Sequence, residues 1–214
     1  TLSMLLIPLI ALMLAYDAIV GEDEGGTLLL LATYPMSRRT WLLGKFMGHA
    51  WVLGLATLCG FAVAGVVIAF ATPEAALAEV AAGLTTLIVS SVLLGWSFLA
   101  LAYWISARAG SKQAAASQAL ITWFVFVLVL DLALLALLVG VRQGGAWLPW
   151  LMLANPAECF RLLVLSAVEP HQASAITALA SATPRSPLLL ALLQVVWVLL
   201  PLGLAIRRFE HRAL

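Results

Sequence analysis

Residues 22–45 read EDEGGTLLLLATYPMSRRTWLLGK, a charged and turn-rich passage inside an otherwise apolar chain. Three carboxylates open the passage, Gly25 and Gly26 follow, and a leucine run ends at Tyr34 and Pro35. Long apolar stretches lie on both sides of it. The passage therefore predicts the place where a membrane-embedded chain comes out into water between two spans.

The composition assigns the chain to the membrane. Hydrophobic residues make up 64% and charged residues 10% of it, whereas soluble domains have about 45–50% and about 25%. Its apolar blocks reach the roughly 18 residues that a helix needs to cross a bilayer, and none alternates like a barrel strand. We expect an all-α integral membrane protein, with residues 1–214 as one transmembrane domain and spans at about 2–20, 46–71, 80–106, 114–139 and 188–206.

The positive charges predict an orientation. Eight of the eleven Lys and Arg residues follow the first, third and fifth spans, and such cations are retained on the cytoplasmic side. This topology places Thr1 outside, so we expect one further span upstream and six helices in the full protein. The net charge of +1 gives no reason to expect nucleic-acid binding.

Two helices are expected in the charged passage. The first would lie on the membrane surface, with Glu22 and Glu24 at its positive amino-terminal end and Pro35 beyond its last turn. The second would begin after Ser37 as N-cap and lead through a basic entrance, residues 38–45, into the second span. The alternative is an ordinary loop that Arg and Lys anchor to lipid phosphates.

The long exterior region, residues 140–187, contains an apolar piece that is too short to span. Asn155 and Pro156 predict a capped helix start for residues 155–168, and Glu158 and Arg161 are spaced to pair at i and i+3. Trp147 and Trp150 are typical of an aromatic belt at a membrane interface. We expect a short re-entrant or surface helix here, either in contact with a periplasmic partner or as a lid without function.

A few other residues within the spans and loops are candidates for a role. Asp131 lies inside the fourth span, where a carboxylate is costly, so it is either a pathway residue or a group bonded to a neighbouring helix. Small residues recur in the second span and allow close packing, within the chain or between two copies; they are Gly44, Gly48, Ala56, Gly60 and Ala64. Cys59 and Cys159 are expected to serve packing.

Motifs of the common catalytic sites are absent from the sequence. It has no GxxxxGK[ST] phosphate loop, HExxH helix, CxxC pair or GxSxG elbow. We therefore expect no enzyme activity, no metal site and no bound cofactor in this chain. Any ATP, with its Mg²⁺, would be held by a separate subunit.

The charged passage resembles ABC-2 type permeases, in which an acidic pair precedes Gly-Thr-Leu, a leucine run, Pro-x-Ser-Arg and Gly-Lys. Leu29 stands where these permeases often have an acidic residue. The resemblance implies an ABC-2 (type V exporter-like) domain whose cytoplasmic coupling helix docks on an ATPase. The matching residues are Glu22, Glu24, Gly26, Thr27, Leu28, Pro35, Ser37, Arg38, Gly44 and Lys45, and the coupling set is taken as Glu22, Glu24, Gly26, Thr27, Arg38, Arg39 and Lys45.

Together with ANPAECFRLLVLSAV at residues 154–168, the passage is similar to permeases that serve nitrous-oxide reductase maturation. This implies a homodimer in the lipid of the bacterial inner membrane, a NosF-like cytoplasmic ATPase and a NosD-like periplasmic protein at Trp147, Trp150, Glu158 and Arg161. The implied role is export of a sulfur species, or conformational work, for copper-sulfide site assembly. An ABC-2 exporter of a polysaccharide, lipid or drug, and an ATP-independent secondary transporter or scaffold, remain alternatives.

Overall fold

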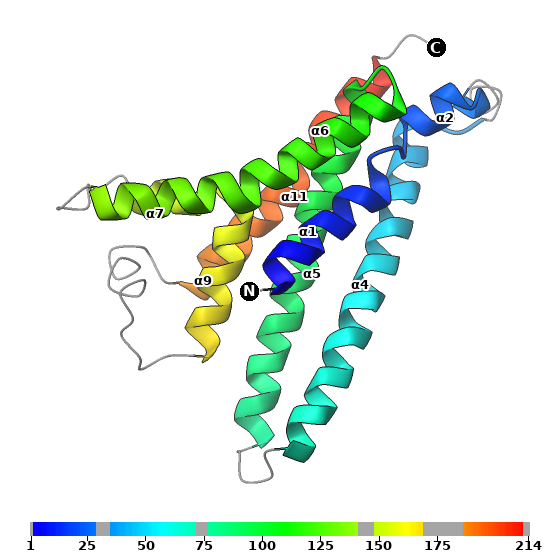
Figure 1. Cartoon of the computed structure of the whole chain (residues 1–214). Coiled ribbons are helices and arrows are strands. Elements are labelled where there is room, and N and C mark those ends of the chain that lie inside the picture. Colours follow the sequence, from blue (N-terminus) through cyan, green and yellow to red (C-terminus); the bar gives the residue numbers. More distant parts are fainter. Residues whose placement is uncertain (1, 29–34, 72–76, 141–147, 169–185, 212–214) are drawn as a thin grey trace.

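The computed structural model describes residues 2–28, 35–71, 77–140, 148–168 and 186–211, and these residues are almost entirely helical, with no strand among them. Figure 1 shows a splayed bundle of long helices with shorter ones at its two ends. The helices are α1 (Leu2–Ala15), α2 (Val20–Glu24), α4 (Arg38–Ala71), α5 (Leu77–Arg108), α6 (Lys112–Phe124), the π-helix η1 (Val125–Val129), α7 (Leu130–Gly140), α8 (Leu148–Leu153), α9 (Pro156–Val168) and α11 (Pro187–Glu210).

The prediction of five spans is confirmed. Five helical segments in the described chain are long and apolar enough to cross a bilayer, namely Leu2–Glu24, Arg38–Ile68, Ala81–Arg108, Lys112–Leu134 and Pro187–Glu210. Several helices extend beyond the predicted apolar cores because charged and aromatic residues at the membrane boundary continue the same helix. The second of them begins at Arg38, directly after Ser37, as predicted.

Helix α5 is the centre of the bundle. It packs against α1, α4, α9 and α11, and Figure 1 shows it running behind α1 and beside α4. Phe98 and Tyr103 on α5 are fully buried, and the ring of Tyr103 meets that of Phe46 on α4 edge to face, with centroids 5.5 Å apart. A movement of any neighbouring helix must therefore be accommodated along α5.

The outward faces of the bundle are as apolar as its interior. Trp51, Val63 and Phe70 on α4 are 69%, 65% and 84% exposed, which suits contact with lipid chains. The predicted small-residue positions of α4 are also exposed, and a Cβ added at Gly44, Gly48 or Gly60 would meet nothing within 4 Å. Packing within the chain therefore does not explain these positions, and Gly65 and Gly95 make the close helix contacts instead.

The fourth span differs from the single regular helix that the sequence predicts. Helices α6 and α7 are joined by η1, a π-helical stretch of five residues. The amide of Asn155, just before α9, donates to the carbonyl of Phe126 within η1 at 2.9 Å. Such π-helical insertions are rare and often occur at functional sites, and this one attaches α9 to the fourth span.

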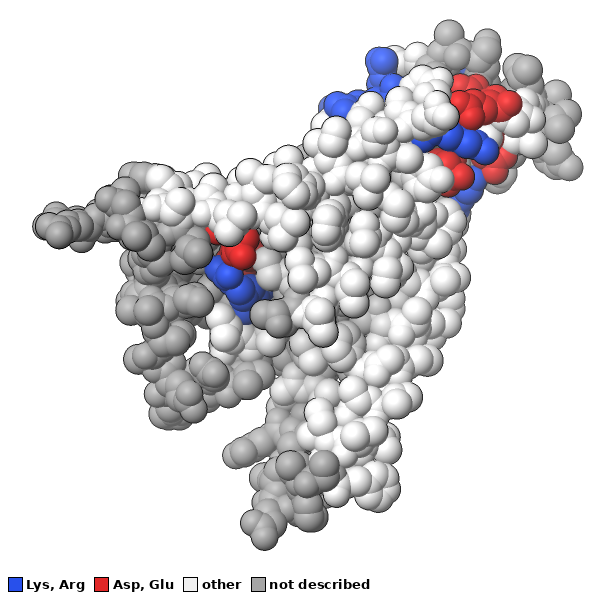
Figure 2. All heavy atoms as spheres, in the orientation of Figure 1, with Lys and Arg blue, Asp and Glu red and all other residues white. Residues whose placement is uncertain are grey.

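Among the side chains that the structure describes, the charged ones form two separate groups. Figure 2 shows one group at the end of the bundle where α2 lies and a smaller one near the middle of the opposite arm. At the first end, the start of α4 bonds to the end of α11 through Arg38, and the start of α6 bonds to α2. The segments predicted to share one side of the membrane therefore lie together; that this side is cytoplasmic stays a prediction.

Candidate functional site

The candidate site is the elbow, which we define as residues 16–28 with the start of α4 at residues 37–45. The chain leaves α1 at Ala15, turns, and forms the short helix α2. At this joint the backbone N–H groups of Ile19 and Val20 both donate to Oγ of Ser106, at 2.9 and 3.1 Å. All three residues are buried, so the hydroxyl of Ser106 satisfies donors that a helix start would otherwise leave unpaired. The joint is thereby fixed to the last turns of α5.

Within the elbow, an ion pair connects α2 to the start of α4. The Lys45 ammonium lies 2.8 Å from Oε1 of Glu22 and donates to the carbonyl of Ala18 at 2.7 Å. It also lies 5.1 Å from the ring centre of Trp41, one helical turn away. Glu22 additionally accepts from the hydroxyl of Thr27. Two predicted coupling residues that are 23 positions apart are thus in direct contact.

A second carboxylate connects the elbow to α6. Oε1 of Glu24 accepts from the backbone N–H of Lys112, the first residue of α6, at 2.9 Å, while Ser111 caps the same helix through the N–H of Ala114. A negative charge at a helix amino terminus interacts favourably with the helix dipole. Gly21 allows the close approach, because a Cβ there would lie 3.1 Å from Cε of Lys112.

The basic entrance to α4 is tied to α11. Ser37 Oγ accepts from the N–H of Thr40, which confirms it as the N-cap. Arg38 donates to the carbonyls of Phe209 and Glu210 at 3.3 and 3.4 Å, in the last turn of α11. These carbonyls carry the partial negative charge of a helix end, which a guanidinium complements.

The remaining predicted coupling residues have simpler places. Gly26 has φ +71, a conformation that favours glycine, and lies at the turn after α2. Arg39 is exposed. Of the predicted surface helix, α2 ends already at Glu24, so Glu24 lies at the carboxyl end of a short helix and not at the amino-terminal end of a longer one. Residues 29–34, which hold the rest of the leucine run and the predicted end at Tyr34, lie outside the described residues. The elbow therefore brings together Glu22, Thr27 and Lys45, and it attaches Glu24 and Arg38 to neighbouring helices.

The second charged group, which we call the distal cluster, consists of Asp131, Glu158 and Arg161. Nη1 of Arg161 lies 2.9 Å from Oδ1 of Asp131 on α7, and its Nη2 lies 2.7 Å from Oε2 of Glu158. The predicted pair at i and i+3 is thus present, and Asp131 has a partner on a neighbouring helix, as one of its two interpretations required. A role of Asp131 in a pathway stays a prediction.

Glu158 is more deeply enclosed than its predicted role suggests. Its side chain is 0% exposed, and burial, together with the nearby Asp131 carboxylate, raises its pKa to about 7 against the opposing effect of Arg161. Contact with a periplasmic partner was predicted for Glu158, but this chain's own residues cover it. Arg161 is 26% exposed, Trp150 lies on α8, and Trp147 lies outside the described residues.

The two cysteines are apart, with Cys159 buried and Cys59 exposed. Burial raises the pKa of the Cys159 thiol to about 12, so that thiol is unreactive and serves packing, as predicted. No group of three or more His, Cys, Asp or Glu residues in the described part of the chain could hold a metal ion. The site is thus made of ion pairs and helix-end contacts that can transmit force between helices.

Comparisons with known proteins identify the family of the chain. A family model described as "ABC-2 family transporter protein" matches residues 2–214. A protein of Pseudomonas aeruginosa named "Probable ABC transporter permease protein NosY" is 50% identical over 215 residues, covering 99% of this chain and 78% of that protein. A protein of the same name from Stutzerimonas stutzeri is 46% identical over 216 residues, with the same coverage. From residue 2 to residue 214, the chain belongs to the ABC-2 family of transporter permeases.

Proposed function

We propose that the elbow is the surface on which a separate, cytoplasmic ATPase subunit docks, and that ATP-driven movement of that subunit moves α1 and α4. The observation that carries the proposal is the double attachment of α2, through Glu22 to Lys45 on α4 and through Glu24 to the first residue of α6. A push on α2 would therefore reach two spans at once. In this proposal, the end of the bundle that carries the elbow faces the cytoplasm.

The contact between the elbow and α5 makes the transmission rigid. Ser106 fixes the joint of α1 and α2 to α5, and α1, α4, α9 and α11 all pack on α5. In a packed interface of this kind, helices move as stiff bodies, since interiors are dense and do not deform continuously. We infer that the ATP-driven movement of the ATPase subunit tilts these spans and reaches α9 at the opposite end. There it supports export or mechanical work on an exterior partner.

The biological role that we propose is maturation of nitrous-oxide reductase. Two relatives that bear the name NosY align over 99% of the chain, and this likeness supports the partners implied by the sequence. These are a second copy of the chain, a NosF-like ATPase carrying ATP and Mg²⁺, and a NosD-like periplasmic protein near α8 and α9. The bacterial inner membrane is the proposed location, and supply of a sulfur species or conformational work for the copper-sulfide site is the proposed task.

Charge reversal tests the docking surface. We expect Glu22→Lys combined with Glu24→Lys to abolish reductase maturation in cells, and to weaken the ATPase association of the full-length permease in mild detergent. The matched control is Glu210→Lys, which reverses an exposed carboxylate at the end of α11, where the backbone carbonyl of the same residue accepts from Arg38. Normal maturation and normal ATPase recovery with the double variant would refute docking at the elbow.

Copurification separates the reductase role from the alternatives. Recovery of a periplasmic protein together with the ATPase supports the maturation role, whereas recovery of the ATPase alone supports an ABC-2 exporter of another cargo, such as a polysaccharide, lipid or drug. Substrate movement without any ATPase would instead support a secondary transporter. Labelling of exposed residues on intact and opened cells gives the orientation independently of the cargo.

A further inference from the structure

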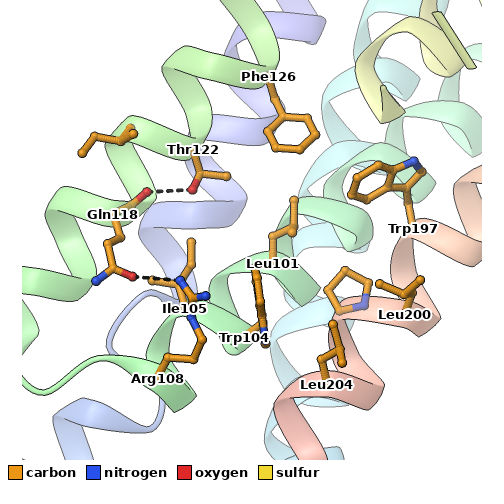
Figure 3. Close-up of a pocket in the computed structure, with 12 residues that line it drawn as sticks. Leu101, Trp104, Ile105, Arg108, Gln118, Thr122, Phe126, Trp197, Leu200 and Leu204 are labelled. Atoms are coloured by element: carbon orange, nitrogen blue, oxygen red, sulfur yellow. Dashed lines mark hydrogen bonds between the residues drawn. The ribbon is translucent and has the colours of Figure 1, made fainter. Parts of the chain in front are cut away.

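A cavity of 540 Å³ lies between α5, α6 and α11, outside the elbow and the distal cluster. This volume falls within the range of about 300–1,000 Å³ that is typical of small-molecule sites. Figure 3 shows Arg108 and Gln118 at one end of it and Phe126 and Trp197 at the other. From Gln118 on α6 to Phe126 in η1 the wall follows the fourth span for about 12 Å, given a rise of about 1.5 Å per residue.

The mouth of the cavity opens toward the lipid-facing surface of the bundle. Among its lining residues, Ile121, Leu200 and Leu204 are 61%, 56% and 39% exposed. These three side chains belong to membrane-spanning helices, so their exposed faces meet hydrocarbon chains. A ligand with a long apolar part can therefore enter sideways from the bilayer.

The polar end of the cavity carries a positioned cation. The guanidinium of Arg108 lies 4.0 Å from the ring centre of Trp104 and donates to Oε1 of Gln118 at 3.3 Å. No carboxylate of the described residues forms an ion pair with Arg108. Stacking and the amide contact hold the guanidinium in place without neutralising it, which leaves its charge for an anion.

We propose that this cavity binds an anionic glycerophospholipid of the leaflet on the charged side of the bundle, with its phosphate at Arg108 and an acyl chain along Leu101, Ile121 and Leu200. Basic pockets between spans at the cytoplasmic side are typical sites for such headgroups. The apolar walls account for a lipid in place of a free phosphate ion. Only the statement that this leaflet is cytoplasmic rests on the proposed function; lipid retention does not depend on ATP coupling.

Native mass spectrometry of the full-length protein tests the proposal. The protein would be exchanged into detergent with phosphatidylglycerol or phosphatidylcholine and titrated. We expect one phosphatidylglycerol to be retained per chain, and Arg108→Ala to weaken its binding about fivefold, the factor that corresponds to about 1 kcal/mol per cation. Leu200→Trp, which fills the mouth, should lower retention of both lipids. Arg208→Ala is the control, because Arg208 is exposed at the same end of the bundle and does not line the cavity.

The other outcomes are equally decisive. Equal binding by wild type and Arg108→Ala would overturn the headgroup contact, and equal retention of the two lipids would overturn the anionic preference. Competition by millimolar inorganic phosphate that removes the bound lipid would show that the site selects phosphate alone. A structure of the full-length complex with a protein segment inside the cavity would also overturn the proposal. A failure of the elbow experiments would leave each of these results unaffected.

Discussion

The elbow and the distal cluster both join helices through ion pairs, yet they differ in solvent access. At the elbow, Lys45 and Glu22 are 25% and 32% exposed, whereas Glu158 in the distal cluster is 0% exposed. Exposed pairs contribute about 0–1 kcal/mol to stability, but a buried charge that loses its partner costs several kcal/mol. The pairs of the elbow can therefore be exchanged at low cost, as the proposed docking of a partner requires, whereas the buried charge of the distal cluster depends on the partner that joins α9 to α7.

The largest expected effect breaks the distal cluster. Arg161→Met removes the one cation that contacts Glu158 and Asp131 in the described structure. We expect it to lower the free energy of unfolding by about 3–5 kcal/mol, because Glu158 is left buried without a counter-charge. Thermal unfolding monitored by tryptophan fluorescence at pH 8 measures this loss.

The double variant Arg161→Met with Glu158→Gln provides the control for that experiment. It removes the buried negative charge together with its partner, so most of the lost stability should return. If both variants are equally unstable, packing of the Arg161 side chain is what matters, and the contrast between the two charged groups fails.

The next effect uses pH to sharpen the same contrast. Burial raises the pKa of Glu158 from its ordinary value of 4.5 to about 7. Because the folded state then binds the proton more tightly, the stabilising contribution is fully present below pH 4.5 and is lost as pH rises through 7. We expect this carboxyl to lower stability by up to about 3 kcal/mol between pH 4.5 and 8, at about 1.4 kcal/mol per unit.

The variant Glu158→Gln should flatten that pH dependence while leaving the contributions of other groups unchanged. Unfolding temperatures between pH 5 and 8 in one detergent are the measurement. If the stability of the wild type instead changes with pH over this interval in the same way as that of Glu158→Gln, the pKa of Glu158 is not raised and the carboxyl is ionised throughout.

The two regions also differ in how far the sequence predicted them. At the elbow, the charges stand within 24 residues, in an order that resembles a known family, so that order predicted which residues belong to the region. The direct contact of Glu22 with Lys45 was not predicted, because the two residues are 23 positions apart. The N-cap Ser37 and the pair Glu158 and Arg161 were predictable for the same reason, since helix geometry fixes contacts between near neighbours.

What the sequence did not predict depends on contacts between distant segments. Arg161 is 30 positions from Asp131, and Ser106 is 86 positions from Val20, so no periodicity relates them. The π-helix at residues 125–129 is likewise hidden in a uniformly apolar stretch. A polar residue near the end of a span, such as Ser106, is the available signal, because a buried hydroxyl needs a partner.

A smaller effect concerns the joint of the elbow. Ser106→Ala leaves the N–H groups of Ile19 and Val20 buried without their acceptor, and we expect a loss of about 1–3 kcal/mol in unfolding free energy. Ser91→Ala is a matched control on the same helix, because the hydroxyl of Ser91 is buried and has no hydrogen-bond partner in the described structure. Thermal unfolding compares the two, and equal losses would deny Ser106 a special role.

The smallest expected effect on stability belongs to the ion pair of the elbow, and it decides whether that pair is structural. A double-mutant cycle of Glu22→Gln and Lys45→Gln should give a coupling energy below about 1 kcal/mol that shrinks further at high salt, because both side chains are partly exposed. The same variants should nevertheless reduce ATPase association and reductase maturation, if these charges serve the partner.

A coupling energy of several kcal/mol with unchanged association would contradict the difference between the two regions, since the ion pair of the elbow would then stabilise the fold as the distal cluster does. Low coupling with lost association would instead indicate that exposed charges at this end are arranged for exchange with another subunit, while those at the other end hold the chain together.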